Sequence, residues 1–114
     1  MSGKLLTVLG IILFSAAAVA SADIIYVDVN GSTGYTSMQP ALDAAAEGDT
    51  VLVLPGTYAG TENKNLDFGG TTVYLVSQSG PEETIIDCED NTNAFDFLEG
   101  DAGPATIIEG FTMT

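Results

Sequence analysis

The side chains that could perform chemistry in this sequence are almost all carboxylates. The chain carries 16 acidic and two basic side chains, no histidine, and a formal charge of −14. Lys4 lies in the leader described below, so Lys64 is the only nitrogen base in the remaining chain. Cys88 is the single cysteine, and without histidine or arginine a reactive nucleophile is its least favoured role. We predict that Cys88 is a small buried hydrophobic residue, with pairing to a cysteine outside this sequence as the alternative.

Two loops concentrate oxygen ligands of the kind that calcium prefers, residues 87–93 and residues 28–32. Neither fits an EF-hand. The first has Thr92 at the glycine position and Leu98 at the glutamate position, and the second has Thr33 and Gln39 there. We therefore predict solvated turn residues on an acidic surface, with calcium in the first loop as the alternative. The sequence indicates no catalytic, cofactor-binding or metal-binding residue.

The charge also restricts the partners. A surface this acidic repels phosphate backbones and anionic lipid headgroups, which excludes nucleic acid. It tolerates high salt, because ions screen the self-repulsion.

Residues 1–22 have the layout of a secretory signal peptide. Lys4 is followed by an apolar run to Val19, and Ala20-Ser21-Ala22 supplies small residues at a cleavage site. An uncleaved signal anchor is the alternative, because the run approaches spanning length. We predict cleavage, no membrane contact afterwards, and a secreted, cell-surface or periplasmic location.

Short strand-like runs recur with a period of 22 residues. The strands that they form would position the side chains of any functional site. Residues 50–54, 72–76 and 94–98 form one series, and residues 84–87 and 106–109 form a second. Alternation within the runs places Val51–Val73–Phe95 and Val53–Leu75–Phe97 inside, Leu52–Tyr74–Asp96 outside, and Ile86 on Ile108. Such runs bury too little apolar surface singly, and stacking them in register would build a continuous core. The pattern predicts an all-β right-handed parallel β-helix, a solenoid, with a β-sandwich as the alternative.

One segment is helical instead. Ser37 is a candidate N-cap, Pro40 falls in the first turn, and Gly48 provides the stop. Met38, Ala41, Leu42 and Ala45 share one face, which predicts a helix that covers the open end of the first coil. The domain prediction is a leader over 1–22, a strand and capping helix over 23–48, and β-helix coils over 49–114. The chain ends on an apolar strand, Phe111 to Thr114, which predicts that further coils follow.

These segments together resemble a known group of proteins. Ile25-Tyr26-Val27-Asp28, the helix that follows, and Gly48-Asp49-Thr50 through Pro55-Gly56-Thr57-Tyr58 are similar to the N-terminal portion of right-handed parallel β-helix proteins of the pectin lyase-like superfamily. The resemblance implies a capping helix before the first coil. It implies little about activity, since the superfamily includes lyases, esterases, polygalacturonases, adhesins and surface proteins.

This segment offers few of the residues that the reactions of this superfamily require. A β-elimination lyase needs a basic residue, for which Lys64 is the only candidate, and the esterase type needs an arginine that is absent. We therefore predict a secreted or surface scaffold that contacts polysaccharide or a cell-surface component, with no catalysis in this segment. The alternative is the first part of a polysaccharide lyase, pectin esterase or polygalacturonase-like enzyme whose active site lies on later coils.

Overall fold

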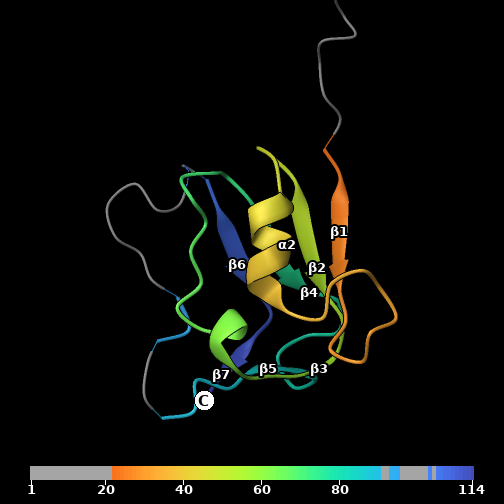
Figure 1. The fold of residues 1–114 in the computed structure, drawn as a ribbon, viewed down its shortest axis with the longest axis vertical. Coiled ribbons are helices and arrows are strands. Elements are labelled where there is room, and N and C mark those ends of the chain that lie inside the picture. Colours follow the sequence, from red (N-terminus) through yellow and green to blue (C-terminus); the bar gives the residue numbers. More distant parts are fainter. Residues whose placement is uncertain (1–21, 91–92, 96–102, 104) are drawn as a thin grey trace, which may run out of the picture.

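The computed structural model describes residues 22–90, 93–95, 103 and 105–114 (Figure 1). The predicted leader lies outside this range except for Ala22, as do Asp96, Phe97 and Leu98. Within it the elements follow in chain order: β1 Ile24–Val27, α2 Met38–Ala44, β2 Thr50–Val53, β3 Gly56–Tyr58, the 3-10 helix η1 Thr61–Asn63, β4 Tyr74–Ser77, β5 Thr84–Ile86, β6 Ile107–Glu109 and β7 Thr112–Met113.

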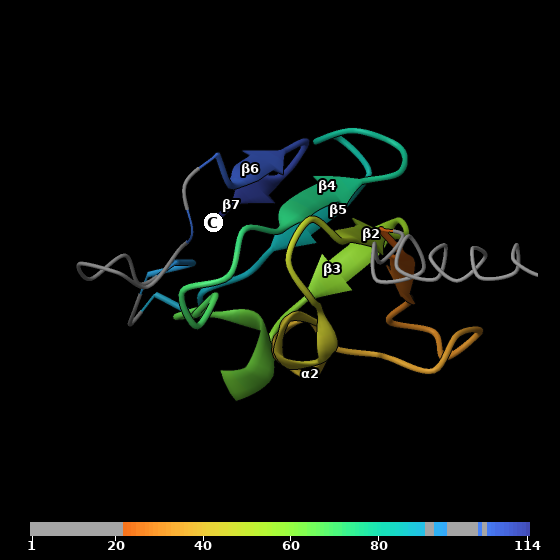
Figure 2. The same cartoon turned by 90° about the horizontal axis from the view of Figure 1, so that it is seen from above.

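The strands form two parallel sheets (Figures 1 and 2). Sheet A has the order β1-β2-β4-β6, and sheet B has the order β3-β5-β7. From β2 onward, each strand of sheet A is followed along the chain by one of sheet B. Parallel neighbours cannot be joined by a tight hairpin, so the chain must return across the domain before each new strand.

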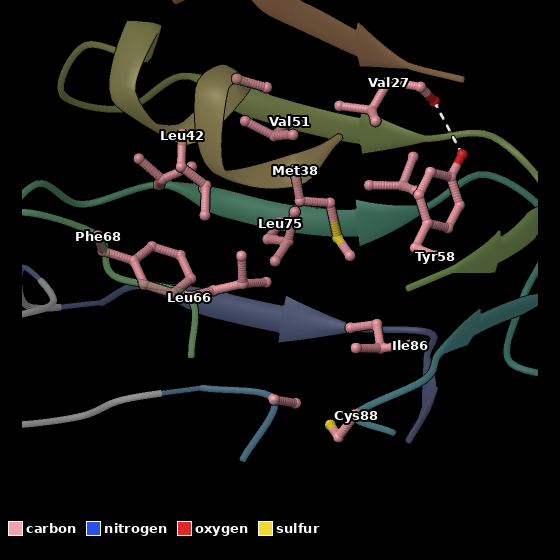
Figure 3. Packing of buried hydrophobic residues seen from close by; sticks show 14 residues of the cluster. Val27, Met38, Leu42, Val51, Tyr58, Leu66, Phe68, Leu75, Ile86 and Cys88 are labelled. Atoms are coloured by element: carbon pink, nitrogen blue, oxygen red, sulfur yellow. Dashed lines mark hydrogen bonds between the residues drawn. The ribbon is translucent and has the colours of Figure 1, made fainter. Parts of the chain in front are cut away.

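The core lies between the two sheets and the helix. Val51, Val53, Leu75 and Ile86 are fully buried strand residues. Figure 3 shows Met38 and Leu42 of α2 directed into the same cluster. The cluster comprises Val27, Met38, Ala41, Leu42, Val51, Val53, Tyr58, Leu66, Phe68, Val73, Leu75, Ile86, Cys88 and Ala94.

The helix was predicted correctly in place and in its buried face. Met38, Ala41 and Leu42 are buried, and Ala45 packs against the core in part. The helix is shorter than predicted, because Ala45 is already extended with φ −74° and ψ 140°. Ser37 occupies the N-cap position, but its side chain makes no capping hydrogen bond.

The prediction of an all-β right-handed parallel β-helix is wrong. The described residues form an α/β-type domain of two parallel sheets and one α-helix. The failure lies in the repeat: paired residues in sheet A are 26, 24 and 33 positions apart (Ile24 with Thr50, Thr50 with Tyr74, Tyr74 with Ile107). Connections of unequal length therefore replace the regular 22-residue coil.

The predicted stacks fail with the period. Val51 pairs with Leu75 rather than Val73, and Phe95 bridges to Leu66. Val53 pairs with Ser77 rather than Leu75. The second series divides between the sheets, since Ile86 pairs with Met113 and Ile108 pairs with Leu75.

The strand residues predicted to be buried are nevertheless buried, although the predicted register is wrong. Val51, Val53, Val73 and Leu75 are all buried as predicted. A slip of two residues leaves every side chain on its original face of a strand, because alternation has a period of two. Hydrophobic alternation therefore could not distinguish an offset of 22 from the observed offset of 24.

Candidate functional site

Lys64, the one predicted candidate base, is held in an ion pair. Its Nζ lies 2.7 Å from Glu89 Oε1, and its side chain is only 12% exposed. The Lys64 hydrogen bond and its charge lower the pKa of Glu89, and the Gly60 N–H donates to the same carboxylate oxygen. An ammonium donating to a carboxylate is poorly placed to abstract a proton, so the pair serves to join the η1 segment to the turn at Glu89.

The acidic loop that begins at Asp87 is a tight turn in its described part. Glu89 and Asp90 both have positive φ, of 59° and 62°, and the Glu89 N–H donates to Asp87 Oδ1. Asn91 and Thr92 lie outside the described residues. Across the described ranges no group of three or more potential metal-ligating side chains gathers. Solvated turn residues stay the prediction for this loop, with calcium as the alternative.

The second oxygen-rich loop directs its carboxylate at its own backbone. Asp28 is buried, and it accepts hydrogen bonds from the Asn30 N–H at 2.9 Å and from the N–H and hydroxyl of Ser32. The Ser32 hydroxyl, followed by the Asn30 N–H, lowers the pKa of Asp28. These contacts fix the loop after β1.

Tyr58 holds the same loop against the core. Its hydroxyl donates to the Leu54 carbonyl at 2.8 Å and accepts from the Val29 N–H at 3.1 Å. Figure 3 shows it directed also at the Val27 carbonyl. Burial raises the pKa of Tyr58, with a smaller effect from the charge of Asp28.

Two further polar residues were not identified from sequence, and both connect distant segments. Asp49 accepts from the Asp23 and Ala46 N–H groups, each at 2.9 Å, and these bonds lower its pKa. Asn63 Oδ1 accepts from the Met38 N–H at 2.8 Å and so supplies the helix cap that Ser37 was expected to provide. Asn63 is 25 positions from Met38 along the chain, and Asp49 is 26 positions from Asp23. Both separations are beyond the reach of a local capping motif.

Cys88 is 7% exposed and belongs to the apolar cluster (Figure 3). The prediction of a small buried hydrophobic residue is therefore confirmed. No pocket is found among the described residues.

The surface feature that remains is the outer face of sheet A. The register places Ile24, Thr50, Tyr74 and Ile107 in one row across the strands, and Tyr26, Leu52, Val76 and Glu109 in the next. Side chains in register on parallel strands share a face, and here that face points away from the core. Six of these eight residues are apolar or aromatic, and Ile24, Tyr26 and Ile107 are 55%, 44% and 46% exposed.

This face is an unusually apolar one for so acidic a chain, and we call it the tyrosine face after Tyr26 and Tyr74. Among the eight residues of this face there is no lysine, and Glu109 is the single charged one. The predicted outward stack Leu52–Tyr74–Asp96 is wrong, because Leu52 pairs with Val76 and Tyr74 pairs with Thr50 and Ile107. Tyr26 was not identified from sequence, since its row depends on the pairing of β1 with β2.

Comparison with known proteins adds no relative. A scan against protein-family models, a search of curated proteins and a search of solved structures each return no match. The resemblance to the pectin lyase-like superfamily therefore stays a prediction. Among the helices of the described ranges, none is long and apolar enough to cross a membrane.

Proposed function

We propose that this chain is an exported scaffold that binds neutral polysaccharide through the tyrosine face. The observation that carries the proposal is the placement of Tyr26 and Tyr74 on one outward, apolar surface. None of the eight residues that define this surface is basic. A tyrosine presents a flat apolar ring and a polar hydroxyl, which suits the apolar face and the hydroxyl rim of a sugar. Exposed apolar patches on soluble proteins commonly mark binding surfaces.

The geometry favours a polymer over a single sugar. Tyr26 lies on β1 and Tyr74 on β4, two strands and two residues apart in register. With strands ~4.8 Å apart and a rise of ~3.3 Å per residue, their Cα atoms are separated by ~12 Å. This spacing suits contacts with successive rings of a sugar chain.

The charge favours a neutral polymer over an acidic one. The chain has a formal charge of −14, and its lysine outside the leader is committed to Glu89. A uronate polymer would meet long-range repulsion with no cation to offset it. The Glu109 carboxylate on the face can accept hydrogen bonds from sugar hydroxyls without that cost.

The polar residues support a binding role rather than catalysis in this segment. Asp28, Asp49 and Asn63 direct their oxygens at backbone N–H groups of this chain. Their contacts stabilise the fold, and they leave the tyrosine face as the surface available to a partner. Export rests on the predicted leader, of which the described residues include only Ala22.

Affinity electrophoresis in gels that contain a soluble neutral β-glucan tests the proposal. The β-glucan should retard the chain, and Tyr26→Ala and Tyr74→Ala should each restore free mobility. Met113→Ala is the matched control, because Met113 is 51% exposed but lies in sheet B. Equal retardation of all variants, or retardation by polygalacturonate alone, would contradict the proposal. Release of unsaturated uronate, read by its absorbance, would favour the lyase alternative instead.

A further inference from the structure

Within the described ranges, the hydrogen bonds of the fold begin at Asp23, the residue that follows the predicted cleavage site. The Asp23 N–H donates to Asp49 Oδ1 at 2.9 Å, and the Asp23 carbonyl accepts from the Thr50 N–H at 2.9 Å. Ala22 is exposed and makes no hydrogen bond with another described residue. The boundary that Ala20-Ser21-Ala22 indicates in the sequence therefore coincides with the first residue that the fold holds in place.

Asp49 is a buried carboxylate that has no cation beside it among the described residues. It is 5% exposed, and its two oxygens accept from the Asp23 N–H and from the Ala46 N–H. The one basic side chain in the described part of the chain, Lys64, pairs with Glu89. Burying a charge is unfavourable unless an opposite charge accompanies it, so a cation at the position of the Asp23 nitrogen would stabilise Asp49.

Cleavage after Ala22 would place such a cation there. Hydrolysis of the Ala22–Asp23 peptide bond adds one water: the new carboxyl group stays on Ala22, and the Asp23 nitrogen becomes a free amino group. An α-amino group has an ordinary pKa of about 7.7–8.0, so it is protonated at neutral pH. The nitrogen that donates to Asp49 as an amide then donates as a cation, and such charge-assisted hydrogen bonds are about twice as strong.

We propose that a leader peptidase cleaves the Ala22–Asp23 bond during export and that the new α-ammonium of Asp23 forms an ion pair with Asp49. Strand β1 begins at the next residue, Ile24, which pairs with Thr50. Figure 1 shows β1 beside β2, the strand into which the turn at Asp49 leads. The ion pair therefore stabilises the start of an edge strand, where strands otherwise fray. The inference rests on the export that the proposed function includes.

The pH dependence of this ion pair follows from its two members. The other titratable groups on the segments that pack here are the carboxylates of Asp23, Asp43 and Glu47 and the phenols of Tyr26 and Tyr74. None of them carries a positive charge that could compete for Asp49. Pairing raises the pKa of the α-ammonium, so its contribution is complete below about pH 7.7 and is lost as the pH rises through the raised pKa. The contribution is also lost in acid, as the pH falls through the lowered pKa of Asp49.

The full chain, expressed with its leader in an exporting bacterial host, tests the cleavage position. Intact mass and N-terminal sequencing of the exported protein should show Asp23 as the first residue. An exported chain that begins at another residue, or one that keeps its leader, would overturn the inference.

Acetylation of the processed protein tests the ion pair. Near pH 6 acetic anhydride reacts with an α-amino group in preference to a lysine, and peptide mapping checks that Lys64 is unmodified. The acetyl group removes the charge and restores an amide N–H at Asp23. In urea unfolding at pH 6.5, acetylation should raise the unfolding constant about threefold or more. This difference should shrink as the pH rises through the raised pKa of the amino group.

Two variants separate the ion pair from other effects of acetylation. Asp49→Asn keeps an oxygen that can accept a hydrogen bond but removes the charge, so acetylation should leave its unfolding constant unchanged. Glu47→Gln is the matched control, because it removes a carboxylate charge from the same turn and keeps an acceptor for the Thr72 N–H. Glu47→Gln should respond to acetylation as the parent does.

Equal stability of the free and acetylated parent would overturn the inference, and so would an equal effect of acetylation in the parent and in Asp49→Asn. The comparison within the parent needs no variant, so a misfolded Asp49→Asn does not leave the question open. Retardation by β-glucan is measured separately. Its loss alone would contradict the proposed polysaccharide binding, whereas an unchanged stability on acetylation, with retardation intact, would contradict the ion pair alone.

Discussion

Replacing Thr84 with valine should stabilise the domain. Thr84 is fully buried at the start of β5, and its Oγ1 has no hydrogen-bond partner among the described residues. Its register partner on β3 is Gly56, which offers no side chain to the hydroxyl. A buried polar group without a partner keeps the cost of leaving water and gains nothing in return.

The magnitude follows from that cost. A buried, unsatisfied hydroxyl destabilises by ~1–3 kcal/mol, and valine replaces it with a methyl group on the same branched Cβ. Thr84→Val should therefore raise the free energy of unfolding by ~1–2 kcal/mol. For a domain of this size each kcal/mol raises Tm by about 4–8 °C. Urea unfolding followed by circular dichroism, with the slope m unchanged, measures the gain.

Thr106→Val is the matched control. Thr106 Oγ1 donates to the Thr71 carbonyl and accepts from the Val73 N–H, each at 3.4 Å. The same chemical change there should lower stability by ~0.5–1.5 kcal/mol, because it removes hydrogen bonds that exist. If Thr84→Val were neutral or destabilising, the Thr84 hydroxyl would have to be satisfied after all, and the reasoning would be refuted.

Three further predictions concern the polar contacts and the charge. Tyr58→Phe removes the hydrogen bonds to Leu54 and Val29 and should cost ~1–3 kcal/mol in urea unfolding; an unchanged midpoint would show that these bonds contribute nothing. Asp49 has a folded pKa below its usual 3.8, so its ionised form stabilises the fold above that pH. The stability advantage of the parent over Asp49→Asn should be complete at neutral pH and shrink as the pH falls below 3.8 and through the lowered pKa; an advantage that did not change with pH would argue against it. Because the formal charge is −14, Tm should rise with NaCl from low ionic strength, and a salt-independent Tm in scanning calorimetry would mean that self-repulsion is negligible.

The proposed function places binding on a surface and leaves the buried polar residues to the fold. The tyrosine face depends on how β1, β2, β4 and β6 pair. The Lys64–Glu89 pair illustrates the division. Sequence suggests a candidate base, whereas the structure uses the lysine to tie two segments together.

The sequence by itself determined which residues are inside. Alternation identified Val51, Val53, Val73 and Leu75, and helical spacing identified Met38, Ala41 and Leu42, all of which are buried. Such patterns are local, because the face on which a side chain lies depends only on its own strand or helix. The acidic charge and the shortage of bases were equally plain from composition.

Only the tertiary structure decided which buried residues meet. The period of 22 led to the wrong β-helix register, since a two-residue slip keeps every face unchanged while it changes every pair. The cap on α2 comes from Asn63, and the tyrosine face arises when β1 pairs with β2 and β2 with β4. These contacts join residues 24 or more positions apart, and their pairing is set by the lengths of the intervening loops, which no local pattern encodes.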